Sequence, residues 1–89
     1  MSLFEYFGMM LTGSDIMQLR LRGGLNKAQL AQKVGVDRKT VGNWENDIGI
    51  PNLNQFFAIC KGCKVSAAEV LKRLEARRFV TDKIDLEGL

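Results

Sequence analysis

The chain has 89 residues, of which 46% are hydrophobic and 26% charged, a composition that is typical of globular proteins and excludes disordered and fibrous classes. A chain of this size buries only about 60% of the surface that it exposes when unfolded, so we expect one domain and no separate ligand-sensing domain. The net charge of +3 is uneven: residues 16–44 carry six basic residues and one acid, which is either a surface that attracts polyanions or a solvated helix face.

The first eleven residues are an apolar extension, and Leu3–Leu11 is the one stretch with a weak strand-like alternation. No basic region precedes it, so we do not expect a secretory signal. The segment is also much shorter than the ~20 residues needed to span a bilayer. These features predict a protein without membrane contact, and the two cysteines, expected as free thiols, indicate a reducing compartment and hence the cytoplasm.

Helix-start signals divide the rest of the chain. A capping residue stands three positions before an acid or an amide in four places, where the two side chains can satisfy each other's backbone N–H groups. These pairs are Thr12 and Asp15, Asn26 and Gln29, Asn52 and Gln55, and Ser66 and Glu69. Asp37 is a further cap, without such a partner. We therefore predict an all-α fold with five helices, at about residues 13–22, 27–34, 38–46, 53–63 and 67–80.

Apolar residues at helical spacing predict the side of each helix that faces the core. The expected inward residues are Ile16, Met17, Leu19, Leu30, Ala31, Val34, Val41, Trp44, Ala67, Val70, Leu71, Leu74 and Ala76. We divide the chain into the extension 1–11, a helical domain at 12–80 and a tail at 81–89.

Cys60 and Cys63 form a C-x-x-C pair that invites a zinc or redox interpretation. A structural zinc site needs four Cys or His ligands, and the chain has two cysteines and no histidine. A thioredoxin-like motif would need a βαβ setting, which is absent here. We expect both thiols to be buried in the core, with no metal and no cofactor.

The most informative stretch joins the second and third predicted helices. Only Gly35, Val36 and Asp37 separate them, and a short turn containing glycine is typical of a helix-turn-helix. In that motif the second helix enters the DNA major groove and its N-terminal residues contact base edges. Here those residues are Arg38, Lys39 and Thr40, with Asn43 one turn beyond Lys39. Cations in a first turn oppose the helix dipole, which favours a functional reason for them over simple solvation.

Residues 25–45, with the sequence LNKAQLAQKVGVDRKTVGNWE, resemble the lambda-repressor/Cro-like (XRE-type) helix-turn-helix family. Signature positions of that family match Leu30-Ala31, Gly35-Val36, Val41 and Trp44-Glu45. Pro51-Asn52 and Val65-Ser66 follow at the family's intervals, so the resemblance covers about residues 12–71. It implies a compact five-helix domain whose second and third helices form the motif.

The resemblance also implies roles for individual residues. It assigns base contacts to Arg38, Lys39, Thr40 and Asn43. Lys27 stands where the family commonly has a glutamine that contacts the DNA backbone. Asn26 and Asn46 are further phosphate contacts, because exposed N–H groups at a helix start attract anions.

Two further roles are structural. The family commonly pairs the arginine matching Arg20 with the glutamate matching Glu45, and a DNA contact by Arg20 is the alternative. Trp44 is expected in the core. Three positions depart from the family: Lys27 replaces the usual amide, Asp37 replaces a serine or threonine, and Asp47 stands where glycine often turns the chain.

The resemblance implies a sequence-specific, double-stranded DNA-binding transcription regulator, expected to be a repressor that binds a palindromic operator as a homodimer. Either the segment Leu3–Leu11 or the end of the last helix, with Phe79, Val80, Ile84 and Leu86, would supply the dimer interface. An antitoxin that binds a toxin and regulates its own gene is a variant, and a protein-interaction module without DNA readout is the alternative class. An enzyme is not expected, because there is no histidine and no glycine-rich phosphate loop.

Overall fold

The computed structural model describes the backbone of residues 11–87 and the side chains of residues 11–77. Its helices are α2 (Gly13–Arg22), α3 (Lys27–Val34), α4 (Arg38–Glu45), α5 (Leu53–Gly62) and α6 (Ala67–Glu87). No strand occurs within residues 11–87. The predicted all-α fold with five helices is therefore confirmed. The strand-like segment at Leu3–Leu11 lies outside the described residues except for Leu11, which is buried.

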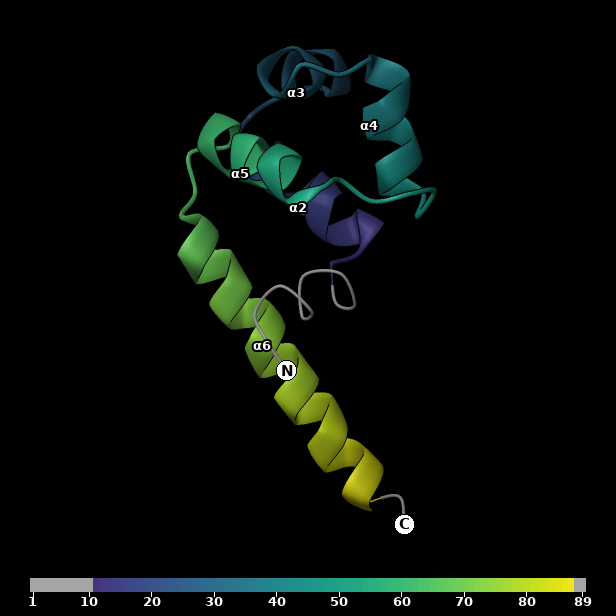
Figure 1. Cartoon of the computed structure of the whole chain (residues 1–89), viewed down its shortest axis with the longest axis vertical. Helices are drawn as coiled ribbons and strands as arrows, with labels where there is room; N and C mark the ends of the chain where they lie inside the picture. The colour runs from purple at the N-terminus through teal and green to yellow at the C-terminus, as the bar shows by residue number, and fades with distance from the viewer. Residues whose placement is uncertain (1–10, 88–89) are drawn as a thin grey trace.

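The helices form a small body with one projecting arm. In Figure 1, α3 and α4 lie at one end of the molecule, α2 and α5 fill the middle, and α6 runs away from them toward the other end. Helix α3 packs on α4 and α5, while α2 also packs on both of these helices. Helix α6 joins the body mainly through α5. The end of the body formed by α3 and α4 is thus left uncovered by α6.

Local capping explains where most of these helices begin. Reciprocal capping boxes form at Thr12 and Asp15, at Asn26 and Gln29, and at Asn52 and Gln55. At the start of α6 the Ser66 hydroxyl accepts the Glu69 N–H at 3.3 Å, which is one of the two bonds of a box. Asp37 occupies the N-cap position of α4, but its side chain makes no capping hydrogen bond. Helix α4 is therefore the one helix of α2–α5 whose N-cap side chain makes no such bond.

The last helix is longer than predicted. It continues to Glu87, whereas the sequence pattern predicted an end near residue 80. No glycine or proline interrupts residues 67–87, so no backbone signal stops the helix where its apolar spacing fades. Although α6 has 21 residues, none of the described helices is long and apolar enough to cross a membrane.

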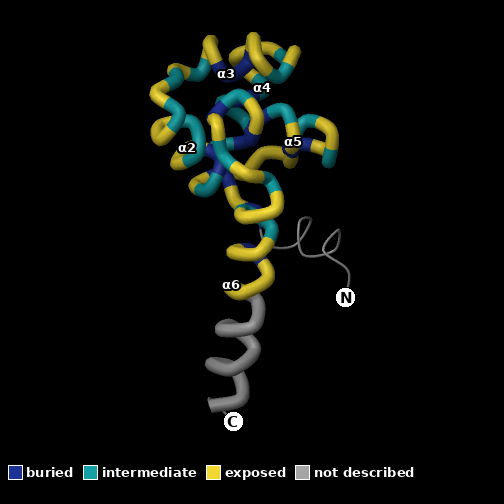
Figure 2. Tube along the Cα trace, turned by 90° about the vertical axis from the view of Figure 1, so that its left-hand side faces the viewer, coloured by how far each residue is buried: buried dark blue, intermediate teal, exposed yellow. Residues whose placement is uncertain are grey.

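The core lies where α2, α3, α4 and α5 meet. Figure 2 shows buried positions concentrated in this body and mostly exposed positions along the described part of α6. The buried apolar residues are Leu11, Ile16, Leu30, Ala31, Val41, Trp44, Phe56, Ile59, Cys60, Cys63 and Leu74. The expected inward positions of Met17 and Ala76 are wrong, since both are exposed. Met17 follows Ile16 by about 100° around α2, which turns its side chain away from the core.

Both cysteines are free thiols in the core, as predicted. Burial raises the pKa of the Cys60 thiol to about 11, and the nearby Cys63 adds to that shift. Burial also raises the pKa of Cys63, although Arg20 and Lys33 oppose this effect. Thiolates are the reactive form of cysteine, so neither residue is activated as a nucleophile at neutral pH.

The raised pKa of Cys60 predicts a loss of stability at alkaline pH. An unfolded cysteine titrates near 9.0, so the native state binds more protons than the unfolded state between pH 9.0 and about 11. This contribution is fully present below the unfolded pKa and is lost as the pH rises through the native pKa. We expect the free energy of unfolding, measured in urea, to fall more steeply over this range in wild type than in Cys60→Ala. Equal pH dependences of the two proteins would contradict the prediction.

Candidate nucleic-acid interface

The turn between α3 and α4 has helix-turn-helix geometry. Gly35 ends α3 in the left-handed conformation, with φ of 83°, and its N–H donates to the Ala31 carbonyl at 2.8 Å. The Val36 N–H donates to the same carbonyl at 3.0 Å. A side chain at position 35 would be strained at this φ, which explains the glycine. The chain can therefore leave α3 and begin α4 after three residues.

The two faces of α4 have different roles. Val41 and Trp44 are 0% and 5% exposed and fix the inner face of α4 against α2 and α3. Arg38 and Lys39 are exposed in the first turn, and neither side chain makes a hydrogen bond or ion pair with another described residue. Their charges oppose the α4 dipole without any compensating partner within residues 11–77. Among the side chains of residues 11–77, none therefore uses these two cations to stabilise the fold.

Two more predicted base contacts belong to the same helix. Thr40 and Asn43 are partly buried at intermediate exposure, between the basic first turn and the inner face. The backbone of Asn43 is engaged, because its carbonyl accepts the N–H groups of Asn46 at 3.1 Å and Ile48 at 2.8 Å. The structure therefore places Arg38, Lys39, Thr40 and Asn43 on one two-turn helix.

The predicted phosphate contacts lie at two different helix ends. Asn26 is the N-cap of α3, and its side-chain oxygen accepts the Gln29 N–H at 2.8 Å, so only its NH₂ group remains for a ligand. Lys27 is the first residue of α3, where backbone N–H groups lack intrahelical partners. Asn46 follows the C-terminus of α4, and its amide donates to the Gly42 carbonyl at 3.0 Å. Asn46 is thus at the opposite end of α4 from Arg38 and is already engaged in capping that helix.

A buried ion pair fixes the C-terminal end of α4 to α2. Arg20 donates from Nε to Oε2 of Glu45 at 2.7 Å and from Nη2 to Oε1 at 3.0 Å. Its Nη1 also donates to the Leu25 carbonyl at 3.1 Å. The two side chains are only 11% and 5% exposed, and the hydrogen bonds to Glu45 raise the pKa of Arg20. The Arg20 side chain is thus fully engaged in contacts within the fold. Of its two predicted roles, the ion pair with Glu45 rather than a DNA contact is the one seen in the structure.

Removing one partner of this pair should destabilise the protein strongly. We expect Glu45→Ala to lower the free energy of unfolding by about 3–5 kcal/mol, because it leaves the buried Arg20 guanidinium without a counter-charge. The double variant Arg20→Met/Glu45→Leu should be less destabilised, since it buries no unpaired charge. Denaturant unfolding of both variants measures the difference. A single variant as stable as the double variant would contradict this account of the pair.

A second link between α2 and the end of α4 was missed by sequence reasoning. The Gly13 N–H donates to Oδ1 of Asp47 at 2.7 Å. Asp47 has φ of 61°, the left-handed conformation that aspartate tolerates better than most side chains. The family to which the sequence bears a resemblance often has glycine at this position, so the aspartate was the sequence signal for this link. It makes the same turn as glycine and adds a carboxylate that binds the start of α2.

Gly13 also lies very close to the backbone of α4. A Cβ atom built at Gly13 would collide with the Trp44 carbonyl oxygen and would lie 2.6 Å from that of Glu45. Helix α2 therefore contacts the last turn of α4 backbone to backbone. Together with the Arg20–Glu45 pair, this contact holds α4 at its C-terminal end and leaves its basic N-terminal turn free.

Comparison with known proteins agrees with this geometry. The family model described as helix-turn-helix matches residues 16–70, which contain all of α3, α4 and α5 and most of α2. No curated protein matches the chain. The matched span covers 55 of the 89 residues, and its central pair of helices is the motif described above. The chain therefore belongs to the XRE-type helix-turn-helix family, whose members are DNA-binding transcription regulators rather than typical enzymes.

Proposed function

We propose that the protein is a sequence-specific repressor that binds double-stranded DNA in the cytoplasm and reads the major groove with α4. The observation that carries this proposal is the pair of exposed cations, Arg38 and Lys39, which have no partner among the described residues. A helix held firmly at one end and presenting unpaired donors at the other suits insertion into a groove. No catalytic step is part of the proposal.

The proposed contacts divide into base readers and phosphate binders. Arg38 or Lys39 would donate to O6 and N7 of guanine, while Asn43 would pair with an adenine edge. Thr40 is short enough to hydrogen-bond a base or to contact a thymine methyl group. The phosphate contacts would come from the start of α3 and the end of α4, through Asn26, Lys27 and Asn46. Contacts of the second kind position the protein without carrying sequence information.

We further propose that two copies bind a palindromic operator. Dimers of this motif place their recognition helices about one DNA turn, ~34 Å, apart. The two segments proposed for the dimer interface lie outside the described side chains, apart from Leu11. The body within residues 11–77 leaves the end formed by α3 and α4 uncovered, so a dimer formed elsewhere would keep both recognition helices accessible (Figure 1).

Selection of bound duplexes from a random DNA library tests the proposal. Wild type is compared with Arg38→Ala/Lys39→Ala and with Lys61→Ala/Lys64→Ala, a control that removes the same charge from exposed positions at the end of α5. We expect wild type and the control to enrich one two-fold symmetric sequence that the first variant does not enrich. An enriched motif without symmetry would overturn the dimeric operator but not the sequence readout.

The alternative, an interaction module without DNA readout, predicts a different outcome. Wild type would then enrich no sequence, and its binding to any duplex would disappear as salt is added, as expected for phosphate contacts alone. That result would overturn sequence-specific repression.

A further inference from the structure

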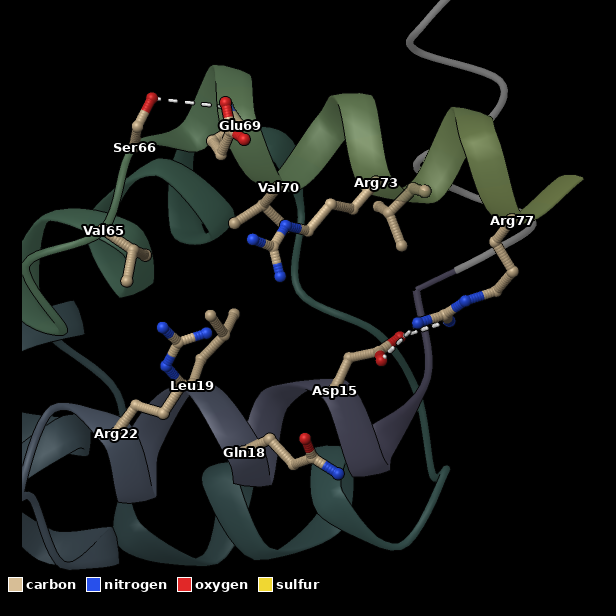
Figure 3. Close-up of a pocket in the computed structure, with 11 residues that line it drawn as sticks. Asp15, Gln18, Leu19, Arg22, Val65, Ser66, Glu69, Val70, Arg73 and Arg77 are labelled. Atoms are coloured by element: carbon tan, nitrogen blue, oxygen red, sulfur yellow. Dashed lines mark hydrogen bonds and ion pairs between the residues drawn. The ribbon is translucent and has the colours of Figure 1, made fainter.

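A half-open cleft lies between α2 and the first half of α6, away from α4. Its volume is about 320 Å³, at the lower end of the range for small-molecule sites. Its apolar part consists of the aliphatic side chains Leu19, Val65, Val70 and Leu74. Figure 3 shows charged side chains from both helices arranged around this apolar surface. The cleft therefore combines an aliphatic lining with a charged rim.

One ion pair closes an end of the cleft. Asp15 of α2 accepts two hydrogen bonds from the Arg77 guanidinium of α6, both at 2.9 Å. Burial raises the pKa of Asp15, but the hydrogen bonds from Arg77 and from the Thr12 backbone outweigh this effect and lower it overall. These two charges neutralise each other and join the two helices.

Two other arginines face the cleft. The guanidinium groups of Arg22, on α2, and Arg73, on α6, both point into the space between the helices (Figure 3). Neither makes a hydrogen bond or ion pair with a described residue. The remaining charge is Glu69, whose backbone N–H binds Ser66 and whose carboxylate has no ion pair within residues 11–77. The described lining residues comprise three arginines and two carboxylates, which gives this part of the cleft one net positive charge.

We propose that this cleft binds a small organic anion with one negative charge and an aliphatic or aromatic body, such as a medium-chain carboxylate. The carboxylate would lie between Arg22 and Arg73, where charge-assisted hydrogen bonds from guanidinium groups are strongest. The apolar body would cover Leu19, Val70 and Leu74. The net charge of the described lining matches a monoanion, and the aliphatic wall favours a ligand with an apolar body over a fully hydrated ion such as phosphate.

The test is a titration of the full-length protein with octanoate, followed by amide chemical shifts, with 1-octanol as a neutral ligand of the same chain length. We expect octanoate to shift the amides of Leu19, Val65 and Val70, and to bind more tightly than octanol. Arg22→Gln and Arg73→Gln should each raise the Kd for octanoate about three- to tenfold. Glu69→Gln should lower it about two- to threefold, because it removes the competing negative charge.

Control variants separate binding from stability. Lys72→Gln removes one charge from an exposed position of α6 that does not line the cleft, and should leave the Kd unchanged. Arg22 lies in the last turn of α2, where a positive charge stabilises the helix through its dipole. The free energy of unfolding of each variant is therefore measured in parallel, so that a loss of stability is not taken for a loss of binding. None of these variants should change the affinity for octanol.

Three results would overturn the proposal. One is an octanoate response confined to α4 or the start of α3, which would show only general attraction of anions to the basic end. Another is equal affinity for octanoate and octanol, or a Kd for octanoate that neither Arg73→Gln nor Glu69→Gln changes. The last is no shift at the cleft up to the solubility limit, as expected if a second copy or another part of the chain already fills it.

Discussion

Arg38→Ala should lower the affinity for the selected operator about 10- to 100-fold per half-site and relax the preference at one base pair. An arginine that bonds a guanine edge through two donors discriminates against other bases by about 1–3 kcal/mol. Because Arg38 is exposed and has no described partner, its removal should change the free energy of unfolding by less than about 0.5 kcal/mol. Equilibrium binding to the operator and to single-base variants of each half-site measures both effects.

Lys27→Ala is the matched comparison for this prediction. It removes one positive charge from the start of α3, where a phosphate contact is proposed, so it should weaken binding to all sequences about equally. The slope of log K against log salt should also become shallower by about 1 for each phosphate that is no longer neutralised. If Arg38→Ala weakens binding to all sequences equally and Lys27→Ala changes the base preference instead, Arg38 contacts phosphate and Lys27 contacts a base, which contradicts the proposed roles.

Gly13→Ala should destabilise the protein by more than about 2 kcal/mol, because the added methyl group meets backbone that cannot move independently. The nearest atoms to a Cβ at this position are carbonyl oxygens and a carbonyl carbon of Trp44 and Glu45. To accept the methyl group, α2 must move away from α4, which would stretch the Gly13–Asp47 hydrogen bond and the ion pair behind it. Overpacking of this kind typically costs about 1–3 kcal/mol, before the polar contacts are weakened.

Gly42→Ala provides the control, because it makes the same chemical change within α4. Apart from its chain neighbours and the backbone of its own helix, no described atom lies within 4 Å of a Cβ built at Gly42, and its φ is not in the left-handed region. Alanine should therefore stabilise α4 by up to about 1 kcal/mol, the difference between the helix propensities of the two residues. Urea unfolding of the two variants gives the comparison. Equal effects of the two substitutions would show that the α2–α4 contact is loose.

What could be predicted from the sequence follows the range of each interaction. The capping boxes act over three residues, so a pair such as Asn26 and Gln29 is visible in the sequence and appears in the structure. The turn at Gly35 was likewise predictable, because a glycine between two amphipathic segments marks a left-handed helix end. Arg20 and Glu45 are 25 positions apart, and only the resemblance to a family suggested their pairing.

The features that could not be predicted depend on how distant segments pack. The Gly13–Asp47 bond joins residues 34 positions apart: Asp47 signals an unusual turn, but nothing near Gly13 identifies this glycine as its partner. The bond between Asp15 and Arg77 spans 62 positions. Arg22 and Arg73 line one cleft only because the first half of α6 lies across that cleft from α2, which no local pattern specifies. The outward position of Met17 depends on the exact rotation of α2, since one residue changes the direction of a side chain by about 100°.

The one-sided attachment of α4 has a consequence for how this protein can change over generations. Val41, Trp44 and Glu45 make the contacts that hold α4 in the fold. The side chains at 38 and 39 make no hydrogen bond or ion pair within the described part of the chain. New residues at these two positions would therefore meet little penalty from the rest of the domain. A duplicated copy could acquire a different operator through changes in its first helical turn while it keeps the same core. If α4 reads DNA as proposed, the preferred sequence can thus drift independently of the architecture that presents it.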